Sequence, residues 1–486
     1  MQDNPGICAV IGRTRHKMMH AEVQEAVKQG ARLIELRLDF LAKAADFKRL
    51  LAARRCPLIA TFRRPSDGGR WGGTEEERHV LLRQAIVAGF DYVDLETDVA
   101  DAIRRFGKVK RIVSYHNLRE TPEDLEDIYA RMCKQDPDMV KIAVTAQQPG
   151  DNLRVLRLIK DAPFPTIAHC MGELGLCSRF LSLRYGAPFT YGAFNKERNF
   201  APGMPSFRDL QKVYFAEQID TNTRVYGVIG DPVGHSLSPL IHNRALRELG
   251  INAVYVPFQV PRGELSAFVQ AFAEVPVRGY SVTIPHKEPA AKLLGKRDEA
   301  VEAMGAANTL MATTGGFASY NTDAQAAIDS LRAHIPQAHD GTTLPLSSRT
   351  VLLLGAGGVA RAVAYALRSE GAALTIANRT LEHAQKLAEV IGCKYVDWAA
   401  RNSTVCDTLI NCTSVGMHPN IDESPVHNSC LKPGLVVFDT VYTPETTLLV
   451  REARSRDCNV LTGVDMFVRQ AGLQFKLFTG MDAPWN

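Results

Sequence analysis

Short apolar segments rich in β-branched residues alternate with amphipathic segments over about the first 215 residues. The apolar segments span 7–11, 33–38, 58–62, 92–95, 111–115, 139–144, 166–169 and 189–193. Between them, stretches such as AEVQEAVKQG and RHVLLRQAIVAG place apolar residues at helical spacing. Eight strands that alternate with helices predict an α/β fold closed into a (β/α)8 TIM barrel, although an open doubly wound sheet shows the same alternation.

The pattern changes near QIDTNTR (218–224), where RVYGVIGDP begins a new strand and a second α/β block. Further on, TVLLLGAGGVARAVAYALRSEG has the pattern of a buried strand, a glycine-rich turn and a helix. We predict a barrel domain at 1–217 and an α/β substrate-binding domain at 225–325, completed by C-terminal helices at about 466–486. A Rossmann domain is expected between them at 326–465.

Composition excludes several classes of protein. The 486 residues carry 57 Lys+Arg and 53 Asp+Glu, a balance too even for a chain that mainly grips nucleic acid or an anionic membrane. No apolar run reaches membrane-spanning length, and the ten cysteines form no CxxC pair. We therefore expect a globular cytoplasmic protein with reduced cysteines and with no metal, nucleic-acid or membrane partner.

Two residues of the barrel segment suggest chemistry. Lys141 lies within the apolar run DMVKIAV of the sixth expected strand. Desolvation favours the neutral amine, which is nucleophilic, but a lysine at a strand end with its head in solvent is an equally good interpretation. His116 ends the fifth strand, at the face where barrel enzymes keep their catalytic residues, although it also suits a packing role.

Four more charged residues fall near strand ends or in a helix of the same segment. Glu35 and Arg37 alternate with leucines in IELRLD and share one face, and Arg63 follows the third strand. These three form either a substrate-binding group or a structural ion-pair cluster. Arg179, in GLCSRF, is either a solvated surface charge or a clamp for a carboxylate.

Six patches in order, ELRLD, TFR with a downstream acid and GG, SYHN, KIAV, GxxSR and APG, resemble type I 3-dehydroquinate dehydratase. The resemblance implies that Lys141 forms a Schiff base with the substrate ketone and that His116 transfers the proton as general base and then general acid. It also implies that Arg179 binds the substrate carboxylate, that Glu35, Arg37 and Arg63 hold hydroxyls, and that Asp67 orients the histidine. The segment before and after APG departs from the family, with Phe200 and Met204 in place of the usual Ser and Gln.

The glycine-rich turn of the second half predicts a dinucleotide site. Its residues Gly355, Ala356, Gly357, Gly358 and Val359 lie between an expected strand and helix, where backbone N–H groups bind a pyrophosphate. About 20 residues further on, where NAD enzymes carry an acid, the chain has Asn378, Arg379 and Thr380, which suit the 2′-phosphate of NADP(H). A tight packing turn without a cofactor is the alternative.

Scattered polar residues of the second half are candidates for binding or catalysis, and some of them have a structural alternative. Ser236 and Ser238 in GHSLSP bind a carboxylate at a helix start, or Ser238 only caps that helix before Pro239. Thr283, Lys287 and Asn308 lie in SVTIPHK and AANTL, and Asp323 in NTD is either functional or a helix cap.

Residues 222–486 resemble shikimate dehydrogenase through GDPxxHSLSP, VTIPHK, AANT, NTD, GAGG, NRT, NCTSVGM and GVDMFVRQ. The resemblance implies that Lys287 and Asp323 form the catalytic pair. It assigns Ser236, Ser238 and Tyr442 to the substrate carboxylate, Thr283, Asn308 and Gln470 to ring hydroxyls, and Thr413, Gly463 and Met466 to the nicotinamide pocket. Two departures are Ala324, where Gly is usual, and His383, where an arginine often assists the 2′-phosphate.

Together the resemblances imply two consecutive reactions on one chain, dehydration of 3-dehydroquinate to 3-dehydroshikimate and its NADPH-dependent reduction to shikimate. One alternative is a quinate/shikimate dehydrogenase with a weakened barrel. Another is a ligand-sensing regulator, which the intact Lys141, His116, Lys287 and Asp323 and the lack of a basic DNA-reading element disfavour.

Overall fold

The structure, a computed structural model, describes residues 5–52, 54–198, 200–335 and 345–484. Contacts between Cα atoms divide the chain into two compact units, Met1–Val277 and Arg278–Asn486. Three sheets organise these units, and each sheet places polar side chains at its strand ends.

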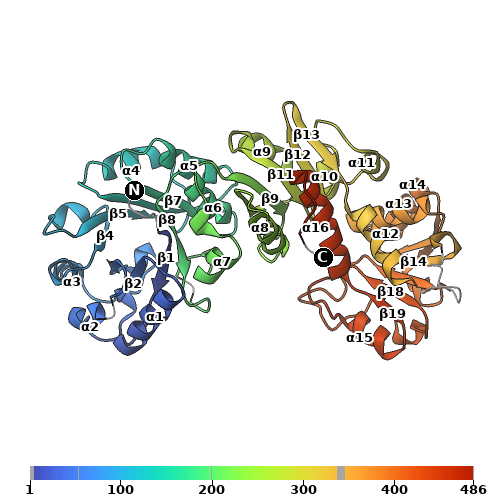
Figure 1. The fold of residues 1–486 in the computed structure, drawn as a ribbon, viewed down its shortest axis with the longest axis horizontal. Coiled ribbons are helices and arrows are strands. Elements are labelled where there is room, and N and C mark those ends of the chain that lie inside the picture. The colour runs from blue at the N-terminus through green and yellow to red at the C-terminus, as the bar shows by residue number, and fades with distance from the viewer. Residues whose placement is uncertain (1–4, 53, 199, 336–344, 485–486) are drawn as a thin grey trace. The chain divides into compact units, whose positions relative to one another are not determined.

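The first sheet has eight strands in the order β7-β6-β5-β4-β3-β2-β1-β8, and its strand pairs are parallel. Because β1 pairs with both β2 and β8, the sheet curls into a nearly closed barrel (Figure 1). The predicted (β/α)8 barrel is therefore confirmed, and the open sheet is wrong. The strands are β1 (Gly6–Ile11), β2 (Ile34–Arg37), β3 (Leu58–Thr61), β4 (Tyr92–Glu96), β5 (Lys110–His116), β6 (Met139–Thr145), β7 (Thr166–Met171) and β8 (Phe189–Ala193).

Helices connect the barrel strands and bury one apolar face each, as their sequence pattern predicts. Helix α3 shows how local sequence sets a boundary: Thr74 and Glu77 form a reciprocal capping box at its start. It ends at Gly89, whose left-handed backbone (φ 94°) suits glycine. The helices are α1 (His16–Lys28), α2 (Phe47–Leu51), α3 (Glu75–Ala88), α4 (Leu125–Met132), α5 (Asp151–Lys160), α6 (Leu176–Arg184) and α7 (Phe207–Lys212).

A second sheet has the strand order β10-β9-β11-β12-β13. Its strands are β9 (Arg224–Gly230), β10 (Ala253–Gln259), β11 (Val277–Val282), β12 (Thr309–Thr313) and β13 (Gly316–Tyr320). β9 and β10 pair in parallel, whereas β12 runs antiparallel to both of its neighbours, β11 and β13. The helices of this part of the chain are α8 (Ser238–Glu248), α9 (Leu265–Ala271), α10 (Lys287–Ala291), α11 (Glu299–Met304) and α12 (Asp323–His334).

The third sheet is parallel, with the order β16-β15-β14-β17-β18-β19. Chain order reverses beside β14, and ligands of such open sheets bind at the carboxyl ends of the strands at this point. The strands are β14 (Thr350–Leu354), β15 (Ala373–Asn378), β16 (Lys394–Asp397), β17 (Thr408–Asn411), β18 (Val436–Asp439) and β19 (Asn459–Leu461). The helices are α13 (Gly358–Ser369), α14 (Leu381–Ile391), α15 (Leu448–Ser455) and α16 (Gly463–Thr479), and α12 packs against α13 and α16.

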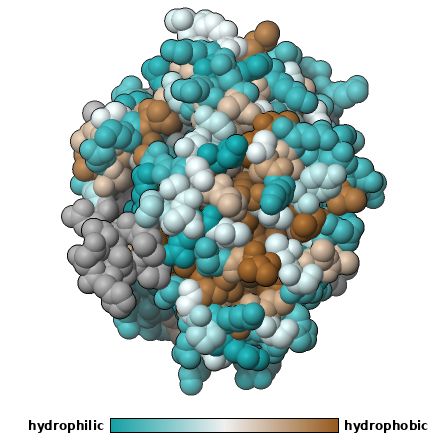
Figure 2. All heavy atoms as spheres, turned by 90° about the vertical axis from the view of Figure 1, so that its right-hand side faces the viewer, coloured by the Kyte–Doolittle hydropathy of each residue, from teal (hydrophilic) through white to brown (hydrophobic). Residues whose placement is uncertain are grey.

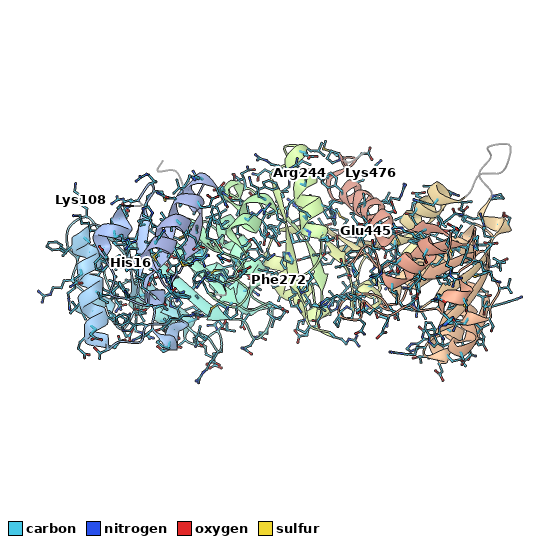
Figure 3. The ribbon with its side chains drawn as sticks, turned by 90° about the horizontal axis from the view of Figure 1, so that it is seen from below. His16, Lys108, Arg244, Phe272, Glu445 and Lys476 are labelled. Atoms are coloured by element: carbon cyan, nitrogen blue, oxygen red, sulfur yellow. The ribbon has the colours of Figure 1, made fainter. Side chains whose placement is uncertain are left out.

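The surface follows the expected polar pattern. Hydrophilic residues cover most of the face in Figure 2, with hydrophobic residues gathered near its centre. Lys476, labelled in Figure 3, lies in the last turn of α16, where a cation interacts favourably with the helix dipole. Among the described residues, no helix combines the length and the hydrophobicity that crossing a bilayer requires.

Candidate active sites

Lys141 lies in the middle of β6 and points into the barrel. The residue is only 5% exposed, so the solvent-facing alternative is wrong. Its Nζ lies 3.0 Å from an oxygen of Asp94 on β4 and 3.6 Å from an oxygen of Glu35 on β2. The same nitrogen lies 4.3 Å from the ring centroid of Tyr191 on β8. Although its own strand is apolar, two carboxylates of other strands face this amine.

His116, the last residue of β5, lines the same cavity as Lys141. Burial, and then the positive charges of Arg63 and Lys141, hold the pKa of its imidazole well below 6.5. The ring is therefore neutral at neutral pH and able to accept a proton. Its Nδ1 lies 3.3 Å from Nη1 of Arg63, whereas the carboxylate of Asp67 accepts hydrogen bonds from Arg64 and Ser66.

The charged residues of the barrel form a dense buried network. Arg37 pairs with Asp39 through two hydrogen bonds of 2.9 Å, and Glu35 accepts one of 2.6 Å from Thr61. Arg63 pairs with Asp94 at 2.7 Å and with Glu96 at 2.9 Å, and Glu96 also accepts from the fully buried Arg78. Sequence reasoning missed Asp39, Asp94, Glu96 and Arg78. A signal existed for two of them, because Asp94 and Glu96 alternate along an apolar strand and so share its inner face.

Arg179 of α6 is fully buried, which excludes the surface alternative. One nitrogen, Nη2, donates to the carbonyl oxygen of Pro202 at 3.3 Å. Its Nε and Nη1 have no hydrogen-bond partner among the residues that the structure describes. Burial lowers the pKa of this guanidinium to about 10. An anion that neutralised this charge would therefore be bound favourably.

A cavity of about 220 Å³ is lined by residues at or near the ends of the barrel strands. Phe200 and Met204 also line it, and the ring of Phe200 packs against that of Phe40 at 5.3 Å between centroids. His169 of β7, which the sequence analysis did not single out, faces the same space. Polar lining is provided by Glu35, Arg37, Arg63, Asp67, His116, Lys141, His169 and Tyr191.

Lys287 and Asp323 form the main ion pair of the second site. They are the first residues of α10 and α12, and Nζ lies 2.5 Å from Oδ2 with both side chains largely buried. Because the carboxylate of Asp323 binds Lys287, its interpretation as a simple helix cap is wrong. The side chain of Lys287 also reaches the turn of the third sheet, since a Cβ built on Gly358 would lie 3.1 Å from its Cδ.

Amide and hydroxyl groups surround this pair in the second unit. Asn308 donates to Thr322 at 2.9 Å, and Thr322 donates to the carbonyl oxygen of Gln470 at 3.2 Å. Gln474, which the sequence analysis missed, is buried and donates to the carbonyl oxygen of Asn308 at 2.9 Å. It lies one helical turn after Gln470, and that spacing is the signal that was available.

Two further predicted residues, Tyr442 and Thr283, have defined local surroundings. Tyr442 stacks on Phe467 at 4.9 Å, and burial, then the charge of Asp323, raise the pKa of its phenol. Thr283 lies just after β11, and its carbonyl oxygen accepts from the amide of His286.

Ser236 and Ser238 lie at the start of α8 in the first unit. The helix begins at Ser238 and its N-cap residue is Leu237, so the interpretation of Ser238 as a plain helix cap is wrong. Instead, the backbone N–H of Ser238 donates to the hydroxyl of Ser236 at 3.2 Å. Both serines are thus grouped at a helix N-terminus, the end that favours an anion.

The predicted dinucleotide turn connects β14 to α13. Gly355 has a φ of 113°, and a Cβ there would lie 2.9 Å from the carbonyl oxygen of Cys412. Gly357 precedes the helix and provides no side-chain cap, and a Cβ there would meet no atom of the described residues within 4 Å. The start of this helix therefore leaves room beside Gly357 for a ligand, and a helix N-terminus favours an anion such as a pyrophosphate.

Residues expected around the rest of the cofactor lie at neighbouring strand ends. Arg379, after β15, is exposed and has no ion-pair partner in the described part of the chain. Asn378 donates to the carbonyl oxygen of Thr380, which precedes α14. Of the remaining predicted residues, Thr413 donates a hydrogen bond to Asn411 at 2.6 Å. Gly463 and Met466 lie in the first turn of α16. Ala356 and Val359 pack against the hydrophobic core of this sheet. These residues fit an NADP-type dinucleotide.

The two sites define an α/β enzyme with a lysine-centred barrel and a separate dinucleotide-dependent unit. Family models for type I 3-dehydroquinase, the substrate-binding domain of shikimate dehydrogenase, and shikimate/quinate 5-dehydrogenase match residues 7–221, 228–310 and 338–439. The chain is 39% identical to the chloroplastic bifunctional 3-dehydroquinate dehydratase/shikimate dehydrogenase of Arabidopsis thaliana, over 99% of this chain and 83% of that relative. It belongs to the family of bifunctional 3-dehydroquinate dehydratase/shikimate dehydrogenases.

Relatives that match only the second half of the chain indicate which cofactor it uses. An NADP(+)-type shikimate dehydrogenase of Shouchella clausii is 38% identical over 53% of this chain and 94% of its own length. A crystal structure of shikimate dehydrogenase with NADP+ is 35% identical, with a TM-score of 0.50, over 54% of this chain and 92% of that one. A structure from Aquifex aeolicus, also 35% identical with a TM-score of 0.50, covers 55% and 96%. The predictions of both families, of an enzyme and of NADP(H) are confirmed.

Proposed function

We propose that the two sites catalyse consecutive steps, dehydration of 3-dehydroquinate to 3-dehydroshikimate in the barrel and its reduction to shikimate with NADPH in the second half. Membership of the bifunctional family supports this order of reactions. The observation that carries the barrel chemistry is the buried amine of Lys141 in one cavity with the neutral imidazole of His116.

In the barrel, the amine of Lys141 attacks the ketone of the substrate and forms a protonated imine with loss of water. The imine withdraws electrons and acidifies the neighbouring C–H, and His116 accepts that proton. The protonated His116 then donates to the departing hydroxyl, and hydrolysis of the imine releases the product. Arg179, whose charge is poorly compensated in this structure, binds the carboxylate, and Glu35, Arg37 and Arg63 hold hydroxyl groups.

In the second half, Lys287 and Asp323 act as one proton-transfer pair at the substrate hydroxyl. NADP, when bound, accepts or supplies the hydride. The position of Lys287 against Gly358 supports this assignment, because it brings the pair to the dinucleotide turn. Ser236, Ser238 and Tyr442 bind the carboxylate, and Thr283, Asn308 and Gln470 bind ring hydroxyls.

We also propose the domain limits 1–217, 225–325 with about 466–486, and 326–465 as the units of function. A cytoplasmic location is proposed from the ten free thiols, which need a reducing compartment. The Arabidopsis relative is named chloroplastic, so an organelle is the alternative location. Cell fractionation that finds the protein in an organelle would contradict the cytoplasmic proposal.

Chemical trapping of the imine tests the barrel proposal. Borohydride added with 3-dehydroquinate should attach a stable adduct to the peptide that contains Lys141, and Lys141→Met should abolish both the adduct and dehydratase activity. Lys110→Met is the matched control, because Lys110 begins the neighbouring strand β5 and its Nζ lies against the ring of Tyr92. An active dehydratase without an adduct at Lys141 would refute the proposal.

A second candidate function rests on the apolar lining by Phe200 and Met204, which provide no side-chain hydrogen bond to a polyhydroxylated substrate. Each lost hydrogen bond costs about 1 kcal/mol of binding. A quinate/shikimate dehydrogenase with a weakened barrel would turn over quinate with NAD at least as well as shikimate with NADP, and would lack dehydratase activity. Steady-state rates for both substrate pairs separate the two candidates.

A further inference from the structure

Asp94 contacts the reacting nitrogen of the barrel more closely than any other carboxylate in the described structure. Its Oδ2 lies 3.0 Å from Nζ of Lys141, whereas the nearest oxygen of Glu35 lies at 3.6 Å. Glu35 also accepts a 2.6 Å hydrogen bond from Thr61 on the same oxygen. Glu96, the other acid of β4, is held by Arg63 and Arg78. Asp94 is therefore the anion that pairs directly with the amine.

The surroundings of Asp94 keep it ionised. It is 2% exposed and accepts hydrogen bonds from Ser114 at 2.5 Å and from Arg63 at 2.7 Å, besides that from Lys141. Burial alone would raise the pKa of this carboxyl, but the charges of Arg63 and Lys141 hold it well below its usual range. A carboxylate that stays ionised cannot act as a general acid at neutral pH, so its contribution is negative charge.

Condensation leaves the positive charge at this nitrogen unchanged, and the charge is absent only while the enamine exists. A lysine ammonium and a ketone give a protonated imine and one water, so the nitrogen has the same charge before and after condensation. Only the protonated imine draws electrons strongly enough to acidify the neighbouring C–H. When His116 takes that proton, the nitrogen becomes a neutral enamine nitrogen, and loss of the hydroxyl as water restores the cation.

We propose that Asp94 is the counter-ion of the Lys141 imine, a catalytic residue whose permanent negative charge keeps the imine nitrogen protonated while His116 moves the proton at carbon. This inference rests on the proposed imine at Lys141. The other titratable or charged groups that face the pair from the surrounding strands are Cys8, Glu35, Arg63, His116, His169 and Tyr191. Of these, only Glu35 offers another nearby negative charge to the nitrogen.

The test is reductive trapping as a function of pH in the full chain. Cyanoborohydride reduces protonated imines, so its rate of adduct formation with 3-dehydroshikimate reports the pH at which the imine loses its proton. In Asp94→Asn the midpoint should fall by about one to three pH units, the usual effect of a neighbouring opposite charge. Dehydratase kcat should fall with it. NADP-dependent oxidation of shikimate by the same chain reports that the second half is intact.

Matched variants separate the counter-ion from other roles. Glu96→Gln also removes a carboxylate partner of Arg63, but Glu96 does not contact Lys141, so its midpoint should stay at the wild-type value. Asp94→Glu retains the negative charge, so its midpoint should lie close to the wild-type value. If Asp94→Asn misfolds, Glu35→Gln decides between the two carboxylates near the nitrogen: an unchanged midpoint leaves Asp94 as the counter-ion, and a lowered midpoint assigns that role to Glu35.

The possible failures are distinguishable. Absence of any adduct at Lys141 in the wild-type chain refutes the proposed function of the barrel. If Lys141 is trapped with the same midpoint in wild type and in Asp94→Asn, the counter-ion role of Asp94 is refuted while the imine stands. A midpoint that falls further in Glu35→Gln than in Asp94→Asn has the same meaning. A rise in KM for dehydroquinate without a shift of the midpoint shows that Asp94 only holds Arg63 in place, and this outcome also overturns the inference.

Discussion

Replacing Arg179 by methionine is expected to stabilise the substrate-free barrel and to remove its affinity for a carboxylate. Burial lowers the pKa of the guanidinium from 12.5 to about 10. At 1.36 kcal/mol per pH unit, holding the charged side chain there costs about 3 kcal/mol. Its hydrogen bond to the carbonyl oxygen of Pro202 offsets about 1 kcal/mol of this. Methionine fills irregular apolar space, so the free energy of unfolding should rise by about 2 kcal/mol.

The sign of the effect of Arg179 on the free energy of unfolding follows from proton binding. Between about pH 10 and pH 12.5 the unfolded chain still binds a proton that folded Arg179 has released. Below pH 10 both states are charged, so the full destabilisation is present at neutral pH, and it is relieved only as the pH rises through that range. Methionine removes the destabilisation at every pH.

Calorimetry of the full chain measures the effect. For a domain of this size 1 kcal/mol corresponds to roughly 2–4 °C, so the barrel transition of Arg179→Met should rise by about 4–8 °C. Dehydroquinate should stabilise the wild-type barrel but not the variant, and dehydratase kcat/KM should fall by at least about tenfold, since a hydrogen bond to a charged group contributes about 1.5–3 kcal/mol.

Arg83→Met is the matched control for this prediction. Arg83 is exposed on α3 and donates to the carbonyl oxygen of Ala102 at 3.1 Å, so its loss should change the free energy of unfolding by no more than about 0.5 kcal/mol. An Arg179→Met barrel that melts below the wild type, or that keeps its KM for dehydroquinate, would show that the guanidinium is a structural residue and refute the reasoning.

Three other predictions concern the two activities separately. Lys287→Met or Asp323→Asn should lower shikimate oxidation by about 10²–10⁴-fold and leave dehydratase rates unchanged, which parallel assays of one preparation would check. Arg379→Ala should reduce kcat/KM with NADP by at least about tenfold but not with NAD; equal losses with both cofactors would contradict contact with the 2′-phosphate. Burial and the charge of Arg63 hold the pKa of His116 well below 6.5, so the acid limb of dehydratase kcat/KM should lie below pH 6.5. The native barrel should also lose stability as the pH falls through 6.5, because the histidine of the unfolded chain gains its proton first. A limb at or above pH 6.5 would show that the base is another group.

Much of the fold follows from local pattern. The apolar segments 139–144 and 189–193 match β6 and β8 closely, because a strand buried on both faces leaves a continuous apolar run. The glycine-rich turn before α13 was also predictable, since the required backbone conformation excludes most side chains at Gly355. Local signals failed at Ser238, where a residue suited to capping begins the helix instead.

The candidate catalytic residues were predicted from the sequence largely through resemblance, whereas the residues that contact them in the structure were not predicted. Asp94 lies 47 positions from Lys141, and Gln474 lies 166 positions from Asn308, so no local spacing connects either pair. His169 of β7 has no sequence signal of its own, and it lines the cavity because the barrel brings its strand there.

The amino-acid order alone determined which segments become strands and helices, where the glycine turn lies and which chemical groups are available, because these depend on neighbours within a few residues. Tertiary structure decided which charges meet. Closure of the barrel carries Asp94 and Glu35 to the amine of Lys141, and it buries Arg179 with two nitrogens that have no hydrogen-bond partner among the described residues. Such electrostatic surroundings are set by distances and desolvation between remote parts of the chain, and these exist only once it has folded.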